Sequence, residues 1–220
     1  MTHHHLTFKR TLSGNVKAYA LGLICLFLIP FASAEPTAKA VLVKNQVTVE
    51  STTKQSKNIK RGHELQVGDV IRTGADARAI FRFYDGSVLT MGANSEITVA
   101  EFNASGQSKK GTFDFVKGAF RMITGAITET DSPDFTVNTP IGSIGIRGTD
   151  FWGGNLATDN SIDVVLLESK HVIEVSNQYG TVILKEPNQG TTLMKDKAPL
   201  STRTWPEAKL QRAFKSVATE

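Results

Sequence analysis

An alternation of apolar and polar residues with a period of two runs through most of the chain after residue 35. It is clearest in residues 78–84 (RAIFRFY), where one alanine and two phenylalanines would share one face of a strand. Gly, Asn and Asp residues typical of turns recur about every 8–12 residues. This pattern predicts an all-β domain of stacked antiparallel sheets, either a sandwich or a solenoid-like stack.

Some strands can be placed more closely. Residues 40–43 and 46–49 flank Lys44-Asn45, which predicts a tight hairpin, and a second hairpin is expected around residues 177–180. Residues 144–146 and 164–167 are apolar at successive positions. We expect these two segments to be central strands that are covered on both faces.

The C-terminal residues, 201–220, are the part of the chain that predicts a helix. Thr204 and Glu207 have the spacing of a capping box. The residues at i, i+3, i+4 and i+7 that follow are apolar and form one stripe: Leu210, Ala213, Phe214 and Val217. We expect this helix to pack on the sheet, and a partner-binding helix is the alternative.

The N-terminus has the features of a cleavable signal peptide. Positive residues precede an apolar run of 14 residues (18–31), which is shorter than the roughly 20 needed to span a bilayer. Ala32-Ser33-Ala34 then provides a small-x-small cleavage pattern, so the cut is expected between Ala34 and Glu35. The sequence therefore predicts a leader over residues 1–34 and an exported protein, periplasmic or secreted, without a stable membrane span. The alternative is an uncleaved leader that anchors the chain.

Charge after cleavage is nearly balanced. Three of the 25 Lys and Arg residues and none of the 21 Asp and Glu residues lie in residues 1–34, which leaves a net charge of +1. The sequence thus gives no electrostatic case for nucleic-acid binding. The single cysteine, Cys25, also lies in the leader, so no internal disulfide is expected in the mature chain.

Motifs for catalysis or metal binding are not recognisable. His63 and His171 have no catalytic neighbours in sequence, and Gly142-Ser143-Ile144-Gly145 is not a nucleophile elbow. Ser51 and Lys54 match a common four-residue pattern within a polar segment. Asp150, Asp159 and Asp163 are too scattered for a metal site and are expected to be solvated. We therefore expect no enzyme activity and no cofactor.

Six short landmarks follow one another in an order that resembles the FecR domain family, over about residues 60–175. The residues that carry the resemblance are Gly68, Asp69, Thr73, Gly74, Asp85, Gly86, Ser87, Thr139, Pro140, Arg147, Gly148, Thr149 and Phe151. They lie in a predicted β domain of residues 35–200, before the C-terminal helix.

The resemblance implies a binding or signalling module rather than an enzyme. Members of the sigma-regulator type carry a cytoplasmic segment that holds a sigma factor, but only 17 residues precede the apolar run here. We therefore expect a free-standing periplasmic module that binds an envelope protein or a cell-wall glycan. A glycan-active enzyme with an unrecognised carboxylate site, and a signal transducer anchored by an uncleaved leader, are the alternatives.

The landmark residues are expected to act mainly in the fold. Gly74 and Gly86 suit turns with positive φ, and Pro140 suits the end of a strand. Arg147 interrupts an apolar strand, so we expect it to be buried and paired with a carboxylate, Asp69 or Asp85. A direct contact between Arg147 and a ligand is the alternative.

We expect the purified exported protein to begin at Glu35, as measured by intact mass. Because Cys25 would then be lost, its melting temperature should be the same with and without a reducing agent. A mass that includes residues 1–34, or a melting temperature that falls in reductant, would contradict the predicted cleavage.

Overall fold

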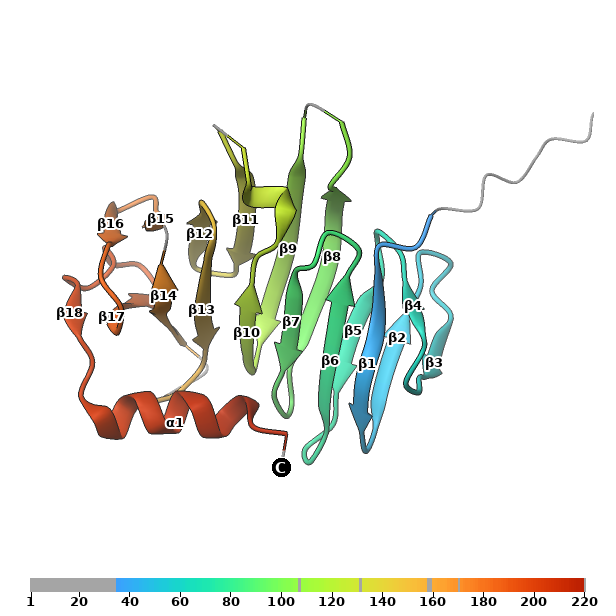
Figure 1. Cartoon of the computed structure of the whole chain (residues 1–220). Helices are drawn as coiled ribbons and strands as arrows, with labels where there is room; N and C mark the ends of the chain where they lie inside the picture. Colours follow the sequence, from blue (N-terminus) through green and yellow to red (C-terminus); the bar gives the residue numbers. More distant parts are fainter. Residues whose placement is uncertain (1–34, 107, 131, 158–159, 170, 220) are drawn as a thin grey trace, which may run out of the picture. The chain divides into compact units, whose positions relative to one another are not determined.

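Two stacked β-sheets and one helix make up the computed structural model (Figure 1). It describes residues 35–106, 108–130, 132–157, 160–169 and 171–219. The predicted leader, with Cys25 and Ala34, lies outside the described residues, as do Asp159 and Lys170. The all-β class with a C-terminal helix is confirmed.

Each sheet has nine strands. Sheet A contains, in spatial order, β18 (Arg203–Thr204), β17 (Gln189–Met194), β14 (Ser161–Ser169), β13 (Thr149–Gly154), β10 (Ala119–Ile123), β7 (Val88–Met91), β6 (Arg78–Phe83), β1 (Ala38–Lys44) and β4 (Glu64–Leu65).

Sheet B contains, in the same direction, β16 (Gly180–Leu184), β15 (Ile173–Asn177), β12 (Gly142–Ile146), β11 (Asp134–Thr139), β9 (Lys110–Lys117), β8 (Glu96–Asn103), β5 (Val70–Thr73), β2 (Val47–Glu50) and β3 (Ser56–Asn58). Strands β9 and β11 run parallel, and the other described pairings are antiparallel.

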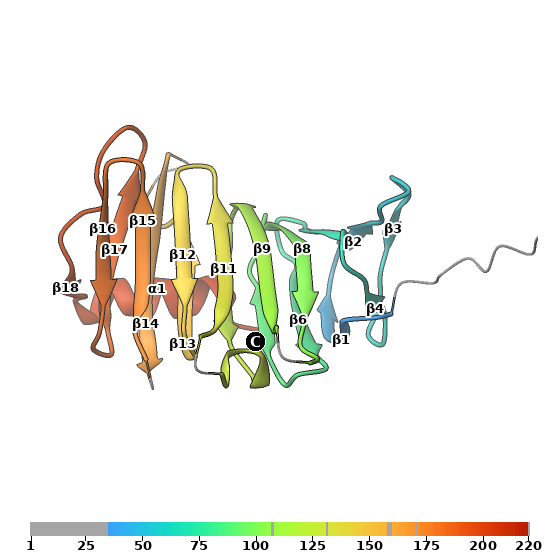
Figure 2. The ribbon, with the colours of Figure 1, turned by 90° about the horizontal axis from the view of Figure 1, so that it is seen from above.

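The chain moves repeatedly from one sheet to the other as it advances along the stack (Figures 1 and 2). The hairpin predicted around Lys44-Asn45 is therefore wrong. Strand β1 pairs with β6 in sheet A and β2 pairs with β5 in sheet B, so this turn connects the sheets. The alternation in each strand was recognised, but alternation alone does not say which strand is the partner. The hairpin of β15 and β16 is confirmed.

The inward-facing residues of both sheets form one apolar core. Phenylalanines dominate its centre, and the fully buried ones are Phe81, Phe83, Phe113, Phe115, Phe120, Phe135 and Phe151. This layer follows from the period-two pattern, because alternate residues of each strand point between the sheets.

Helix α1 (Glu207–Val217) packs across the outer face of sheet A (Figure 1). Its Leu210, Ala213 and Val217 meet β14 and β13, so β14 is covered on both faces as predicted. For β12 the same prediction is wrong, because Gly145 lines a surface groove. The capping box is also absent: Pro206 precedes the helix, with no side-chain cap.

Two interactions hold the start of α1 against the sheet. Trp205 meets Trp152 edge to face with ring centroids 6.2 Å apart. Lys209 lies 4.0 Å from the centroid of the Trp205 ring and donates to the buried carboxylate of Asp163 at 2.6 Å. Asp163, expected to be solvated, is thus buried because the helix supplies its counter-charge.

His63 lies just before β4, near the N-terminal end of the stack. Its Nε2 is buried and has no hydrogen-bond partner among the described residues. Burial, and next the positive charge of Lys57, lower the pKa of His63 below its ordinary value. The folded protein therefore binds a proton at His63 less readily than the unfolded chain does.

We expect the stability of the protein to fall as the pH drops below about 6.5, the ordinary pKa of histidine, because protonation then favours the unfolded chain. Between pH 8 and pH 5, the melting temperature should fall less for His63→Leu than for wild type. His171→Leu, which replaces the other histidine of the described residues, is measured alongside for comparison. If the melting temperature of His63→Leu falls between pH 8 and pH 5 by as much as that of wild type, this role for His63 is contradicted.

Candidate functional site

The connection between β12 and β13 carries the densest part of the family-like motif. Arg147 and Gly148 form the turn in which the chain crosses from sheet B to sheet A. Gly148 has φ +105°, and a Cβ there would lie 3.2 Å from Oγ1 of Thr128. Only glycine fits this crossover without strain.

Thr149 joins the crossover to the segment after β10. Its amide donates to Oγ1 of Thr124 at 2.9 Å, and the amide of Thr124 donates to the carbonyl of Thr149 at 3.1 Å. Thr128 Oγ1 lies 3.2 Å from Thr124 Oγ1 and 3.0 Å from the carbonyl oxygen of Gly125. Residues 124–128 are therefore held against the crossover by polar contacts.

The β6–β7 turn holds the other side of the same segment. The carboxylate of Asp85 accepts hydrogen bonds from the amide of Ser87 at 2.8 Å and from the amide of Ile127 at 3.1 Å. Ser87 Oγ accepts from the amide of Gly125 at 2.8 Å. Gly86, with φ +90°, makes the turn as predicted. Motif residues far apart in sequence thus meet around the short 3-10 helix Ala126–Thr128.

A surface pocket of about 490 Å³ opens beside this network, and we call it the crossover pocket. Its polar lining comprises Thr124, Thr128, Glu129, Asp150, Glu168 and His171. Ile123 and Pro187 add apolar surface. Apolar atoms make up the larger part of the lining surface, and the carboxylates of Glu129, Asp150 and Glu168 are set among them.

Asp150, the most deeply buried carboxylate of this pocket, forms a bidentate ion pair with Arg121 of β10. Nε and Nη2 of Arg121 donate to the two carboxylate oxygens at 2.9 and 2.5 Å. Hydrogen bonding to Asp150 raises the pKa of Arg121. Both oxygens of Asp150 are thus engaged, which leaves this carboxylate poorly placed to act as a general acid or base. The expectation that Asp150 is solvated is wrong.

Arg147 is exposed, so the prediction of a buried ion pair is wrong. The expected partners are used elsewhere: Asp69 accepts from the amide of Gln66 at 2.9 Å, and Asp85 accepts from backbone amides. Arg147 instead lines a groove of about 410 Å³ on the outer face of sheet B, beside Gly145 and Glu174. It ends the strand rather than continuing it, and its side chain therefore reaches solvent.

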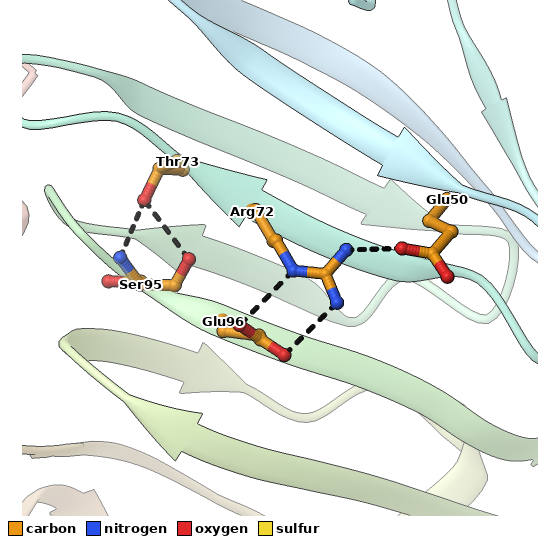
Figure 3. A network of polar contacts seen from close by, with 5 residues as sticks. All are labelled: Glu50, Arg72, Thr73, Ser95 and Glu96. Atoms are coloured by element: carbon orange, nitrogen blue, oxygen red, sulfur yellow. Dashed lines mark hydrogen bonds and ion pairs between the residues drawn. The ribbon is translucent and has the colours of Figure 1, made fainter. Parts of the chain in front are cut away.

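A second set of motif residues lies near the opposite ends of the strands. The hydroxyl of Thr73 donates to the carbonyl of Gly92 at 2.6 Å. It also accepts from the amide of Ser95 at 2.8 Å (Figure 3). Next to it, Arg72 forms ion pairs with Glu50 at 2.7 Å and with Glu96 at 3.1 Å (Figure 3). These contacts link β2, β5 and β8 of sheet B.

The remaining motif residues lie in turns or in the core. Gly68 has φ +92°, whereas Gly74 is not among the residues with positive φ, so that prediction is wrong for Gly74. Thr139 donates to the carbonyl of Gly142 at 2.7 Å across the β11–β12 turn, which contains Pro140. Phe151 is fully buried.

Metal ligands do not gather in the part of the chain that the structure describes: no group of three His, Cys, Asp or Glu residues could hold an ion. Within the same residues, no helix is long and apolar enough to cross a membrane. Ser143 lies in β12 and faces Ser176 at 3.1 Å.

Arg121, Thr124 and Thr128 were missed at the sequence level. One signal existed: Asp150 is a lone charge between Thr149 and Phe151 in an apolar strand, and a buried charge requires a partner. Arg147 does not need such a partner, because it lies in the turn between β12 and β13 and is exposed.

Comparison with known proteins agrees with the geometry of the motif. Residues 69–170 match the family model described as FecR protein, so this part of the chain is a FecR domain. No curated protein matches the chain.

Two crystal structures of one protein, described as a candidate anti-sigma factor from Parabacteroides distasonis ATCC 8503, are similar in fold. Determined at 2.50 and 1.65 Å resolution, each is 15% identical with a TM-score of 0.51. The match covers 64% of this chain and 62% of that one, and it supports the fold alone. A structure described as a cell surface anchoring domain is 23% identical over 30% of this chain and 86% of its own, with a TM-score of 0.29, and no argument rests on it.

We expect Arg121→Met to destabilise the protein by about 2 kcal/mol, because Asp150 would keep its buried charge without its hydrogen-bond donors. Arg147→Met is the matched control and should leave the free energy of unfolding within about 0.5 kcal/mol of wild type. Urea unfolding measures both. Equal effects of the two substitutions would contradict the assignment of Arg121 as the partner of the buried carboxylate.

Proposed function

We propose that this chain is a non-enzymatic interaction module of the bacterial cell envelope that acts in the periplasm and binds its partner at the crossover pocket. The observation that carries the proposal is the convergence of motif residues from separate segments. Asp85, Ser87 and Thr149 hydrogen-bond the same short segment and thereby shape one wall of an open pocket. Such a preformed, concave site, with polar groups placed on a mostly apolar lining, suits recognition.

The FecR domain supports a role in binding or signalling, since the family resemblance implies a module of that kind. The related solved structure is described as a candidate anti-sigma factor. An anti-sigma role is not carried over to this chain, whose match spans 62% of that relative.

An envelope protein fits the surface better than a cell-wall glycan. Sugar rings are commonly bound by stacking on aromatic side chains. The exposed aromatic residues of the described chain lie on three separate elements: Tyr84, Tyr179 and Phe214. The crossover pocket instead combines a mostly apolar lining with carboxylates and hydroxyls, which suits a protein partner that presents an apolar side chain next to a basic one.

A glycan-active enzyme is the second candidate, because Glu129, Asp150 and Glu168 all line one pocket. A glycosidase needs two carboxyl groups with different protonation states on either side of the bond. The ion pair of Asp150 with Arg121 argues against this role. Incubating the purified protein with peptidoglycan and analysing the products by mass spectrometry tests it directly.

We expect residues 35–220, immobilised and exposed to envelope extract, to retain the same protein in repeated experiments. The double variant Glu129→Lys/Glu168→Lys should lose that protein, because both side chains line the pocket. Asp76→Lys, at the other end of β6, is the control and should retain it. Sedimentation with purified peptidoglycan in parallel shows whether the partner is the glycan.

Turnover of peptidoglycan that is abolished by Glu129→Gln or Glu168→Gln would overturn the proposal in favour of the enzyme. Retention of the same proteins by wild type and by the double variant would place the binding site elsewhere.

A further inference from the structure

The outer face of sheet A is divided between the area that α1 covers and an area that remains accessible. The helix packs on β14, β13 and β10 (Figure 1), and just after its end the carbonyl of Ala218 accepts a hydrogen bond at 2.9 Å from Nε of Arg78 in β6. Beyond that point lie the outward residues of β6 and β1. We call this accessible area the basic trough.

The trough has an apolar floor. Leu42 of β1 lies directly opposite Ile80 of β6, and Val88 of β7 lies diagonally next to Ile80. All three side chains are half-buried. Val88 in turn faces Ile123 of β10, which is 39% exposed. The aliphatic surface thus runs across four neighbouring strands.

Cations lie on both sides of Leu42 and Ile80. On one side, Lys39 and Arg82 are register partners in the same row as Val88 and Ile123, and on the other side Lys44 and Arg78 are register partners. Lys39, Lys44 and Arg82 are exposed. Strands rise about 3.3 Å per residue, so the rows are about 13 Å apart, close to the 10–12 Å diameter of a helix with its side chains.

The length also suits a helix. From β4 to β10 the trough crosses five strands, which spans about 19 Å at about 4.8 Å per strand. A helix of about 13 residues has the same length. The 11-residue helix α1 already packs across the strands of this face, so the sheet accommodates that geometry.

Charge decides what kind of helix fits. Three carboxylates lie at the edges of the trough. Glu64 accepts from the hydroxyl of Tyr84 at 3.3 Å, and Asp150 pairs with Arg121. Asp76 lies beside Lys44 and Arg78, at the end of the trough where α1 ends. Under α1 the sheet supplies the acid, Asp163, and the helix supplies the base, Lys209. In the trough the sheet supplies bases on both sides, so a complementary helix must carry acidic residues on both flanks of an apolar stripe.

We propose that the basic trough is a docking surface for an acidic amphipathic helix of a partner protein. The trough meets the crossover pocket at Ile123 and Asp150, but its cations and the rest of its floor lie outside the pocket. The proposal does not rest on the proposed function. The helix would place its apolar stripe on Leu42, Ile80 and Val88 and its carboxylates beside the two rows of cations.

The test uses a fluorescein-labelled peptide of about 14 residues, with leucines at i, i+3, i+4, i+7 and i+11 and glutamates on both flanks. Fluorescence anisotropy measures its binding to residues 35–220. We expect saturable binding that weakens with added salt. The double variant Lys44→Glu/Arg82→Glu should weaken binding by about tenfold or more. The control Lys185→Glu/Lys195→Glu, which changes the charge equally on exposed residues elsewhere, should bind as wild type does.

Three results would overturn the proposal. The first is equal binding of the acidic peptide, its scrambled form and a version with lysines in place of glutamates. The second is unchanged binding by Lys44→Glu/Arg82→Glu, checked by melting curves to be folded. The third is that the peptide does not bind the wild-type protein, whereas wild type binds phosphatidylglycerol vesicles or self-associates in sedimentation velocity and this variant does not. In that case the occupant is a lipid surface or a second copy.

Discussion

Packing of aromatic rings between the two sheets is the interaction on which the rest of this structure depends. Phe83 lies 5.4 Å from Phe113, and Phe113 lies 5.4 Å from Phe135, measured between ring centroids. These contacts join β6 of sheet A to β9 and β11 of sheet B. Without a disulfide among the described residues, burial of apolar surface between the sheets is the main source of stability. The sheets must therefore stay aligned, and the turns that connect them are constrained accordingly.

The recurrent crossing between sheets explains why the family motif consists of turn residues. At each crossing the backbone leaves the hydrogen-bonding pattern of one sheet, and its amides and carbonyls need other hydrogen-bond partners. Asp85 and Ser87 supply them for residues 125–127, and Thr73 supplies them for Gly92 and Ser95. Stabilising one such crossing also builds the wall of the crossover pocket. The same residues thus serve the fold and shape the site, which is why motif residues need not touch a ligand themselves.

The two faces of the stack differ in what they offer to a partner. Sheet A is covered in part by α1, and its remaining outer face combines aliphatic side chains with cations. Sheet B presents short polar side chains, such as Asn138, which donates to Asp114 at 2.9 Å, and also the ion pairs of Arg72 with Glu50 and Glu96. The crossover pocket lies at the strand ends and combines a mostly apolar lining with three carboxylates. A module with surfaces of different charge can hold more than one partner, or one partner at two places.

Local sequence patterns were enough to predict several features of the fold. These are the all-β class, most strands, the Asp85-Gly86 turn and a C-terminal helix that packs on the sheet. These follow from side-chain periodicity and turn chemistry, which act over a few residues. Tertiary structure decided the pairing of β1 with β6, the exposure of Arg147 and the ion pair of Asp150 with Arg121, 29 residues away. The alternation of apolar and polar residues in a strand is the same whichever neighbouring strand it pairs with, so the alternation does not identify the partner. A charged residue in an apolar strand predicts that an oppositely charged partner exists. Which residue is that partner depends on the register between strands that are distant in sequence.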